Sequence, residues 1–99
     1  SVDDHIDQIV GLLAELGELE NTIIMYTSDH GFQLGQHRLS VDKRHLYEHD
    51  IKVPFMVYSG KSQSTRGRIS NEIVLNIDIA PTIYELVTGS NIIPESMDG

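Results

Sequence analysis

The apolar run at residues 23–25, Ile-Ile-Met, is the feature that most constrains how this chain can fold. Its members follow one another without alternation, and the neighbouring Thr22, Tyr26 and Thr27 favour strands. A continuous apolar run of this length is typical of a strand buried on both faces, as in a parallel α/β sheet. We therefore predict a buried strand over residues 21–28.

An amphipathic helix is predicted at each end of the chain. In the first, apolar residues recur at steps of three or four, the period of one helix face. Ser1 and Asp4 resemble a capping box at its start, and Gly17 is placed to end it. The second helix is expected to begin after Asp78 and to close at Gly89. The apolar positions of the first helix are Val2, Ile6, Ile9, Leu13 and Leu16.

The middle of the chain is predicted to add a short helix and two strands. Asp42 is placed to cap a short helix over residues 43–49. Residues 53–58 and 72–77 are predicted strands, and residues 60–70 a mobile surface loop. The order helix, strand, short helix, strand, strand, helix is that of an α/β layered fold.

Composition excludes several classes of partner. The formal net charge of −8 argues against a nucleic-acid binder and offers no basic surface to anionic lipid. No uninterrupted apolar run approaches the roughly 20 residues of a membrane-spanning helix. The absence of cysteine excludes disulfides and thiolate metal sites. With 99 residues, a helical pattern at the first residue and an end in mid-turn, we expect a piece of a larger domain.

Asp29 and His30 follow the predicted buried strand directly. Ligands of open α/β sheets bind at the carboxyl ends of strands, and Gly31 would let the backbone turn so that both side chains converge. A carboxylate oxygen and an imidazole nitrogen are both metal ligands. Strands also commonly end in polar turn residues, so an ordinary turn is the competing interpretation.

Lys43 is a candidate for binding an anion. At the start of the predicted short helix, its ammonium could meet an anion beside free backbone N–H groups. The alternative is a solvated lysine beside Arg44, because such charges mostly lie on solvated faces.

Three further histidines are harder to assign. His45 and His49 are four residues apart and would share a helix face, a spacing compatible with metal binding. No Glu lies at the position that a zinc-protease helix requires, since Tyr47 and Glu48 intervene, so we interpret both as surface or packing residues. His37 is a weaker candidate for substrate contact, and the roles of all three stay open.

Two longer stretches of the chain resemble the sulfatase family. They read "NTIIMYTSDHGFQLGQHRLSVDKRHLYEHDIKVPFMVYSG" and "VLNIDIAPTIYELVTG". Their elements "TSDHG", "DKRHLYEHDIKVP" and "DIAPTIYEL" occur in the order typical of the family and together are far more specific than any one alone. The match is closest to the N-acetylglucosamine-6-sulfatases, with the extracellular heparan sulfate 6-O-endosulfatases as near relatives, and it covers essentially the whole chain.

The resemblance implies an alkaline-phosphatase-like α/β sandwich, with residues 1–99 forming a C-terminal part of the sulfatase catalytic domain. It implies that Asp29 and His30 bind one Ca²⁺ ion, whose remaining ligands lie outside this chain. It also implies that Lys43 contacts the sulfate group. A lysine there would neutralise charge on the bound sulfate and on the transition state.

The catalytic groups themselves are expected elsewhere. The family's nucleophile is a formylglycine made within a Cys/Ser-x-Pro-x-Arg motif, which this chain lacks. That nucleophile and the family's general acid are expected upstream, so we assign no catalytic residue here. The chain alone is predicted to be inactive.

The function implied is hydrolysis of 6-O-sulfate esters on glucosamine residues of heparan or keratan sulfate by the full-length protein. A sulfated glycan is the expected partner, and the resemblance suggests a lysosomal or extracellular location. Two alternatives stay open. One is a phosphodiesterase or phosphonate hydrolase of the same fold, and the other is a non-catalytic, truncated homologue that binds sulfated glycans.

Overall fold

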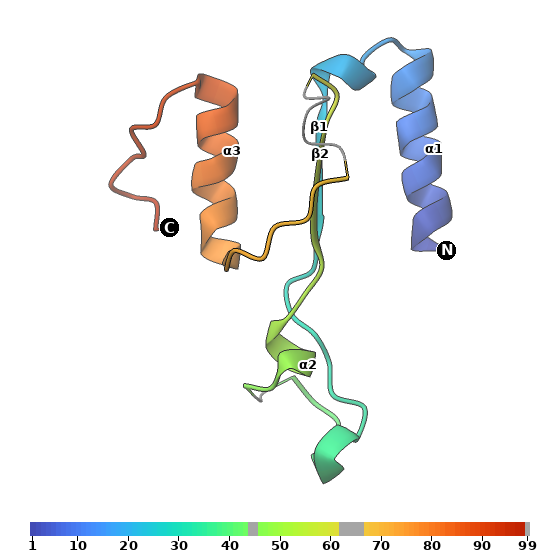
Figure 1. Ribbon diagram of the computed structural model, residues 1–99, viewed down its shortest axis with the longest axis vertical. Helices are drawn as coiled ribbons and strands as arrows, with labels where there is room; N and C mark the ends of the chain where they lie inside the picture. The colour runs from blue at the N-terminus through green and yellow to red at the C-terminus, as the bar shows by residue number, and fades with distance from the viewer. Residues whose placement is uncertain (44–45, 62–66, 99) are drawn as a thin grey trace. The chain divides into compact units, whose positions relative to one another are not determined.

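A computed structural model of the chain describes residues 1–43, 46–61 and 67–98 (Figure 1). The chain divides into two compact units, Ser1–Arg68 and Ile69–Gly99. The first unit holds an N-terminal helix, a two-stranded sheet and, between the two strands, a long excursion that contains a short helix. The second holds one helix with the segments on either side of it. None of the helices in these described ranges is long and apolar enough to cross a membrane.

Helix α1 spans Val2–Glu15, as the apolar periodicity predicts. The Ser1 side chain accepts a hydrogen bond from the Asp4 N–H, and the Asp4 carboxylate accepts from the Ser1 backbone, so the capping box is present. Beyond the helix, Gly17 has φ of +71°, a left-handed conformation that glycine adopts at little cost. Local signals therefore define both ends of this helix.

Strands β1, Ile23–Thr27, and β2, Phe55–Ser59, form the two-stranded sheet of the first unit. They pair antiparallel, with Ile23 opposite Ser59 and Thr27 opposite Phe55. The prediction of a parallel sheet is therefore wrong for the strands that the structure describes. The chain leaves the carboxyl end of β1 and returns beside it to start β2, which imposes the antiparallel direction (Figure 1).

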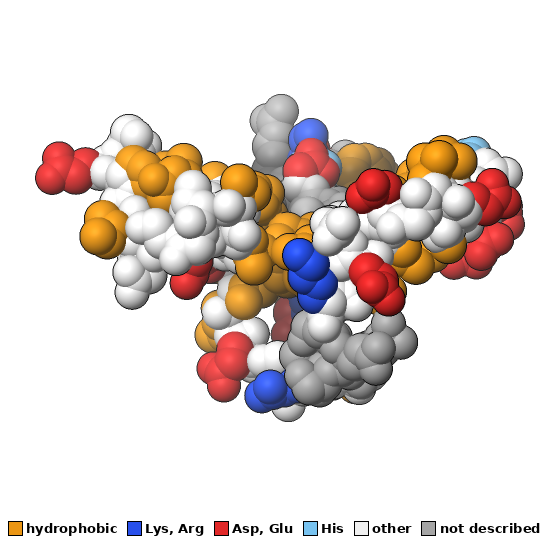
Figure 2. Space-filling model, turned by 90° about the horizontal axis from the view of Figure 1, so that it is seen from above, with side chains coloured by type: hydrophobic (Ala, Val, Ile, Leu, Met, Phe, Trp, Pro, Cys, Tyr) orange, Lys and Arg blue, Asp and Glu red, His pale blue; other side chains and the backbone are white. Residues whose placement is uncertain are grey.

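The apolar side chains lie largely at the surface. No large aliphatic or aromatic side chain within the described ranges is fully buried, and Figure 2 shows broad areas of exposed apolar side chain. Strand β1 is half-buried, apart from the exposed Ile23, so its predicted burial on both faces is not found in this chain. Exposed apolar area of this extent is typical of surfaces that other protein segments cover.

The short helix predicted over residues 43–49 is wrong in position. The observed helix α2 spans Glu48–Ile51 and starts only after Tyr47, whose backbone is extended. The Asp42 carboxylate accepts from the N–H of Lys43, its immediate neighbour, at 2.8 Å, whereas a capping side chain serves the second or third helical N–H. Asp42 also forms an isolated antiparallel bridge with Gln33, which holds the chain extended there.

In the second unit, helix α3 spans Ile79–Thr88 and ends at Gly89, which has φ of +69°. The strand predicted over residues 72–77 is wrong, because the described part of the chain offers it no paired strand. A 3₁₀ turn, Asn76–Asp78, precedes α3 instead, and the Asp78 carboxylate accepts from the Leu75 N–H at 2.8 Å. The loop predicted over residues 60–70 lies partly outside the described residues.

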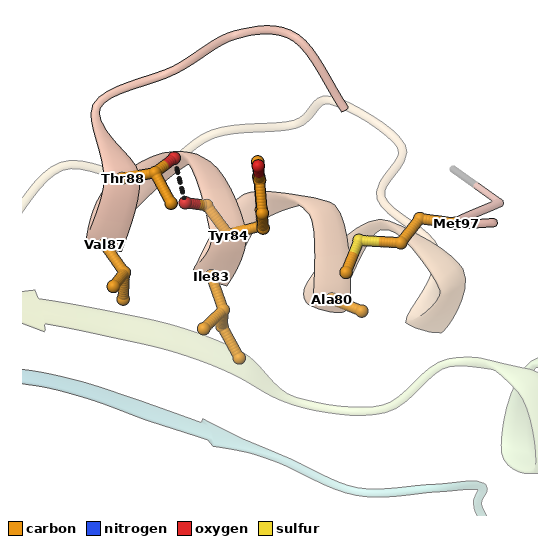
Figure 3. Close-up of a pocket in the computed structure, with 6 residues that line it drawn as sticks. All are labelled: Ala80, Ile83, Tyr84, Val87, Thr88 and Met97. Atoms are coloured by element: carbon orange, nitrogen blue, oxygen red, sulfur yellow. Dashed lines mark hydrogen bonds between the residues drawn. The ribbon is translucent and has the colours of Figure 1, made fainter. Parts of the chain in front are cut away.

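A shallow apolar pocket of about 250 Å³ lies on α3 (Figure 3). The Thr88 hydroxyl beside it donates to the Tyr84 carbonyl at 2.7 Å, so its polar edge is internally satisfied. It offers neither a carboxylate nor an imidazole, and we do not consider it a catalytic site. Its lining residues are Ala80, Ile83, Tyr84, Val87, Thr88 and Met97.

Candidate metal and anion site after strand β1

Gly31 fixes the position of the residues that follow β1. Its N–H donates to the Asp50 carbonyl at 2.7 Å, which joins the end of β1 to helix α2. A Cβ at Gly31 would stand 1.7 Å from the His49 carbonyl oxygen, so only glycine fits. The φ of Gly31 is not positive. Its role is therefore close approach of two backbone segments rather than a left-handed conformation.

Asp29 sits in a turn that its own neighbours stabilise. Its Oδ1 accepts from the His30 N–H at 3.0 Å, and the Ser28 hydroxyl donates to the His30 carbonyl at 2.9 Å. The His30 N–H is the main cause that holds the pKa of Asp29 below its ordinary value, and the Ser28 hydroxyl adds to it. The carboxylate is 81% exposed, so it is both ionised and reachable from solvent.

The contacts of His30 define its tautomer. Its Nδ1 lies 2.6 Å from the Gly31 carbonyl, which can only accept, so Nδ1 carries the proton. Its Nε2 lies 2.8 Å from the Lys43 Nζ, and an ammonium can only donate. In this arrangement His30 presents the lone pair of Nε2 to the Lys43 ammonium. A histidine whose other nitrogen donates to a backbone carbonyl has the orientation usual among metal ligands.

Asp29 and His30 are the two residues that could share a cation. Asp29 Oδ2 lies 3.2 Å from His30 Nε2, and in this tautomer both atoms are acceptors that face each other without a hydrogen between them. Neighbouring ligands of one cation are about 3 Å apart when each bond is about 2.0–2.6 Å long. Two ligands do not complete a coordination sphere. Within the described ranges, no group of three or more His, Asp or Glu residues gathers around one point.

Lys43 reaches the same point from another segment. It lies at a bend beside the bridge between Gln33 and Asp42, not at a helix start as predicted. Its ammonium nevertheless contacts His30 at 2.8 Å. The structure thus brings together the three residues that the sequence singled out, although no helix N-terminus takes part.

His37 and His49 form a separate group with Tyr47. The His37 ring stacks on Tyr47 with centroids 5.3 Å apart, and the His49 ring is 5.8 Å from His37 in a tilted arrangement. His37 and Arg38 have φ of 58° and 60°, a left-handed conformation that is uncommon for residues other than glycine. His45 lies outside the described residues, so its predicted helix face with His49 is not described either.

Two buried polar residues beside the site escaped the sequence analysis. Asp50 is 3% exposed, although charged residues are seldom fully buried. Gln33 is fully buried. No periodicity marks either residue, because Gln33 lies in the irregular segment after β1 and Asp50 lies in the single-turn helix α2.

The chain belongs to the sulfatase family, whose family model matches residues 1–90. It is 44% identical over 99 residues to the N-acetylglucosamine-6-sulfatase of Homo sapiens and to the extracellular sulfatase SULF-1 homolog of Drosophila melanogaster. These matches take in all of this chain, but only 17% and 8% of the two relatives. The chain therefore spans less than a fifth of the length of these relatives.

A solved structure is similar over 99% of this chain and 19% of its own, with a TM-score of 0.82 and 39% sequence identity. It is the structure of BT4656 in complex with its substrate, D-glucosamine-2-N,6-O-disulfate. Family and structural neighbour together confirm the predicted α/β fold of the alkaline-phosphatase-like type. Within such a fold, the surfaces left open in this chain are those that further segments would cover.

Proposed function

We propose that this chain is a segment of a sulfuric ester hydrolase of the N-acetylglucosamine-6-sulfatase type. The substrate class proposed is 6-O-sulfate on glucosamine residues of heparan or keratan sulfate. The observation that carries the proposal is the meeting of Asp29 Oδ2, His30 Nε2 and Lys43 Nζ, with His30 within 3.2 Å of both partners. The names of the relatives and the sulfated sugar bound to the structural neighbour support the substrate class.

Asp29 and His30 would hold Ca²⁺ through one carboxylate oxygen and one imidazole nitrogen, with further ligands from outside this chain. A bound divalent cation supplies positive charge that stabilises developing negative charge on the ester. Lys43 would supply a second positive charge, in contact with the sulfate oxygens. Both groups stabilise charge, so the bond-making step requires a nucleophile that this chain does not contribute.

By the full-length protein we mean a protein that contains this chain and is as long as its relatives. In that protein we propose a formylglycine nucleophile upstream of this chain. A lysosomal or extracellular location is proposed from the relatives, one of which is named an extracellular sulfatase. The partner is then a sulfated glycan. The −8 formal charge of the chain disfavours binding of a polyanionic glycan. Positive charges at the site must therefore offset this repulsion.

One alternative keeps the site and changes the ester. Phosphate monoesters and diesters also present anionic oxygens to a metal ion and a lysine, so a phosphodiesterase or phosphonate hydrolase uses the same groups. The second alternative is a truncated homologue that binds sulfated glycans without turnover. Both keep Asp29, His30 and Lys43 in contact with an anion.

Steady-state assays of the full-length protein separate these three functions. We expect sulfate release from N-acetylglucosamine 6-sulfate to exceed phosphate-ester hydrolysis by at least 100-fold in kcat/KM. Faster hydrolysis of bis-p-nitrophenyl phosphate would favour the phosphodiesterase. Binding of heparan sulfate without release of sulfate would favour the non-catalytic homologue.

A further inference from the structure

We propose that the Lys43 ammonium takes the place of the metal ion at His30 when no metal is bound. In the metal-free protein this ammonium occupies the lone pair of His30 Nε2, and a divalent cation must displace it to bind. The proposal rests on the proposed function, because it assumes that Asp29 and His30 form the metal site.

The His30 ring has a single nitrogen lone pair that can accept a hydrogen bond or bind a metal ion. Its Nδ1 donates to the Gly31 carbonyl at 2.6 Å, which leaves Nε2 as the only acceptor on the ring. Lys43 Nζ occupies that acceptor at 2.8 Å. One lone pair serves one partner, so Lys43 and a metal ion cannot both bind His30 Nε2.

Electrostatic attraction explains why the Lys43 ammonium lies beside Asp29 and His30. Asp29 Oδ2 and His30 Nε2 are two acceptors 3.2 Å apart, and their proximity is unfavourable without positive charge close by. A Lys ammonium is a compact positive charge on a flexible stem, so it can approach and withdraw without moving the backbone. The Lys43 backbone is anchored separately, since its N–H donates to the Asp42 carboxylate at 2.8 Å.

Displacement has a consequence for the order of binding. While Lys43 contacts His30, its ammonium is engaged at the metal position. Once a cation takes the Nε2 lone pair, Lys43 is released next to the cation and becomes available to an anion. The cation therefore favours anion binding in two ways: its own positive charge attracts the anion, and its binding frees the Lys43 ammonium. We expect the anion to bind after the cation.

Crystal structures of the full-length protein test the displacement directly. After treatment with EDTA, we expect Lys43 Nζ within hydrogen-bond distance of His30 Nε2. With Ca²⁺ bound, we expect the two atoms to be more than about 4 Å apart and Nε2 to face the ion. Calcium on Asp29 and His30 with Lys43 still hydrogen-bonded to Nε2 would overturn this inference alone. Calcium bound elsewhere would overturn the proposed metal site and this inference with it.

Calorimetric titration with Ca²⁺ gives an independent readout. Removing the competitor with Lys43→Met should tighten binding by roughly three- to tenfold, the range of one lost hydrogen bond to a charged group at a partly exposed site. The control Lys52→Met removes the same charge from a 75% exposed lysine and should change the affinity less than twofold. At 0.5 M KCl, long-range repulsion is screened whereas a direct contact is not, so the gain should persist. A gain that disappears in salt would contradict displacement.

Discussion

The α-carbon of Gly31 lies against the carbonyl group of His49, so closely that a Cβ on Gly31 would stand 1.7 Å from the carbonyl oxygen. The neighbouring hydrogen bond, from Gly31 N–H to the Asp50 carbonyl, is 2.7 Å long. This contact joins the carboxyl end of β1 to α2 and thereby fixes where Asp29 and His30 leave the strand.

Gly31→Ala is therefore expected to destabilise the protein. The clash is with backbone, which cannot rotate away as a side chain can, so we expect a loss on the order of 1–3 kcal/mol in the free energy of unfolding. Gly11→Ala is the matched control, because Gly11 lies inside α1 with open space around it and alanine favours helices by about 1 kcal/mol. Urea unfolding measures both. Equal effects of the two substitutions would contradict the packing role of Gly31.

The pKa of Asp29 should lie below its ordinary value in the metal-free protein. Its Oδ1 accepts from the His30 N–H, and folding forms that bond. Because the folded-state pKa is lowered, the resulting stabilisation of the turn is present above the ordinary pKa of a carboxyl. It is lost as pH falls through the lowered value. Carboxyl ¹³C NMR in EDTA should give a midpoint below that of an unfolded peptide of residues 26–32. A midpoint equal to the peptide's would refute the hydrogen-bonded turn.

The left-handed backbone of Arg38 gives a prediction about strain. At φ of 60°, Arg38 carries a steric cost of roughly 1–2 kcal/mol that glycine avoids. Since glycine also loses more entropy on folding, Arg38→Gly should be neutral or up to about 1 kcal/mol more stable. Arg38→Val should lose more than about 1 kcal/mol, because β-branched residues fit this region worst. Thermal unfolding of the two variants provides the comparison, and a more stable valine variant would disprove the backbone conformation.

The chain by itself should bind calcium poorly and release no sulfate. Asp29 and His30 supply two ligands, whereas Ca²⁺ takes six to eight. We expect a dissociation constant in the millimolar range for the 99-residue chain. Isothermal titration and a sulfate-release assay measure the two quantities. Turnover by this chain alone would show that the nucleophile lies within it.

Local signals explain which parts of the fold could be predicted. The capping box of Ser1 and Asp4 and the left-handed Gly89 act within one turn, so the helices α1 and α3 follow from sequence. Strand pairing depends on residues far apart, and nothing near Ile23 reveals that its partner is Ser59, in antiparallel direction. Residues 72–77 have strand-like composition but acquire no partner within the described ranges.

The sequence singled out the three residues that the structure brings together, but not their geometry. The polar residues after β1 mark Asp29 and His30, and chain order relative to known sulfatases marks Lys43. The contact between His30 and Lys43 depends on the loop around the Gln33–Asp42 bridge, which carries no periodic pattern. Asp50, whose charge suggested a surface position, is buried within the single-turn helix α2.

We propose that Asp29 and His30 bind the metal ion on which sulfate-ester hydrolysis depends. The most direct measurement is calcium content together with sulfate release from N-acetylglucosamine 6-sulfate, in the full-length protein and its Asp29→Ala variant. Asp7→Ala serves as the control, because it removes an exposed acid from α1. We predict that Asp29→Ala loses the bound calcium and at least 100-fold in kcat/KM, as loss of a metal ligand should cause. An Asp29→Ala variant with full calcium content and normal turnover would contradict the account.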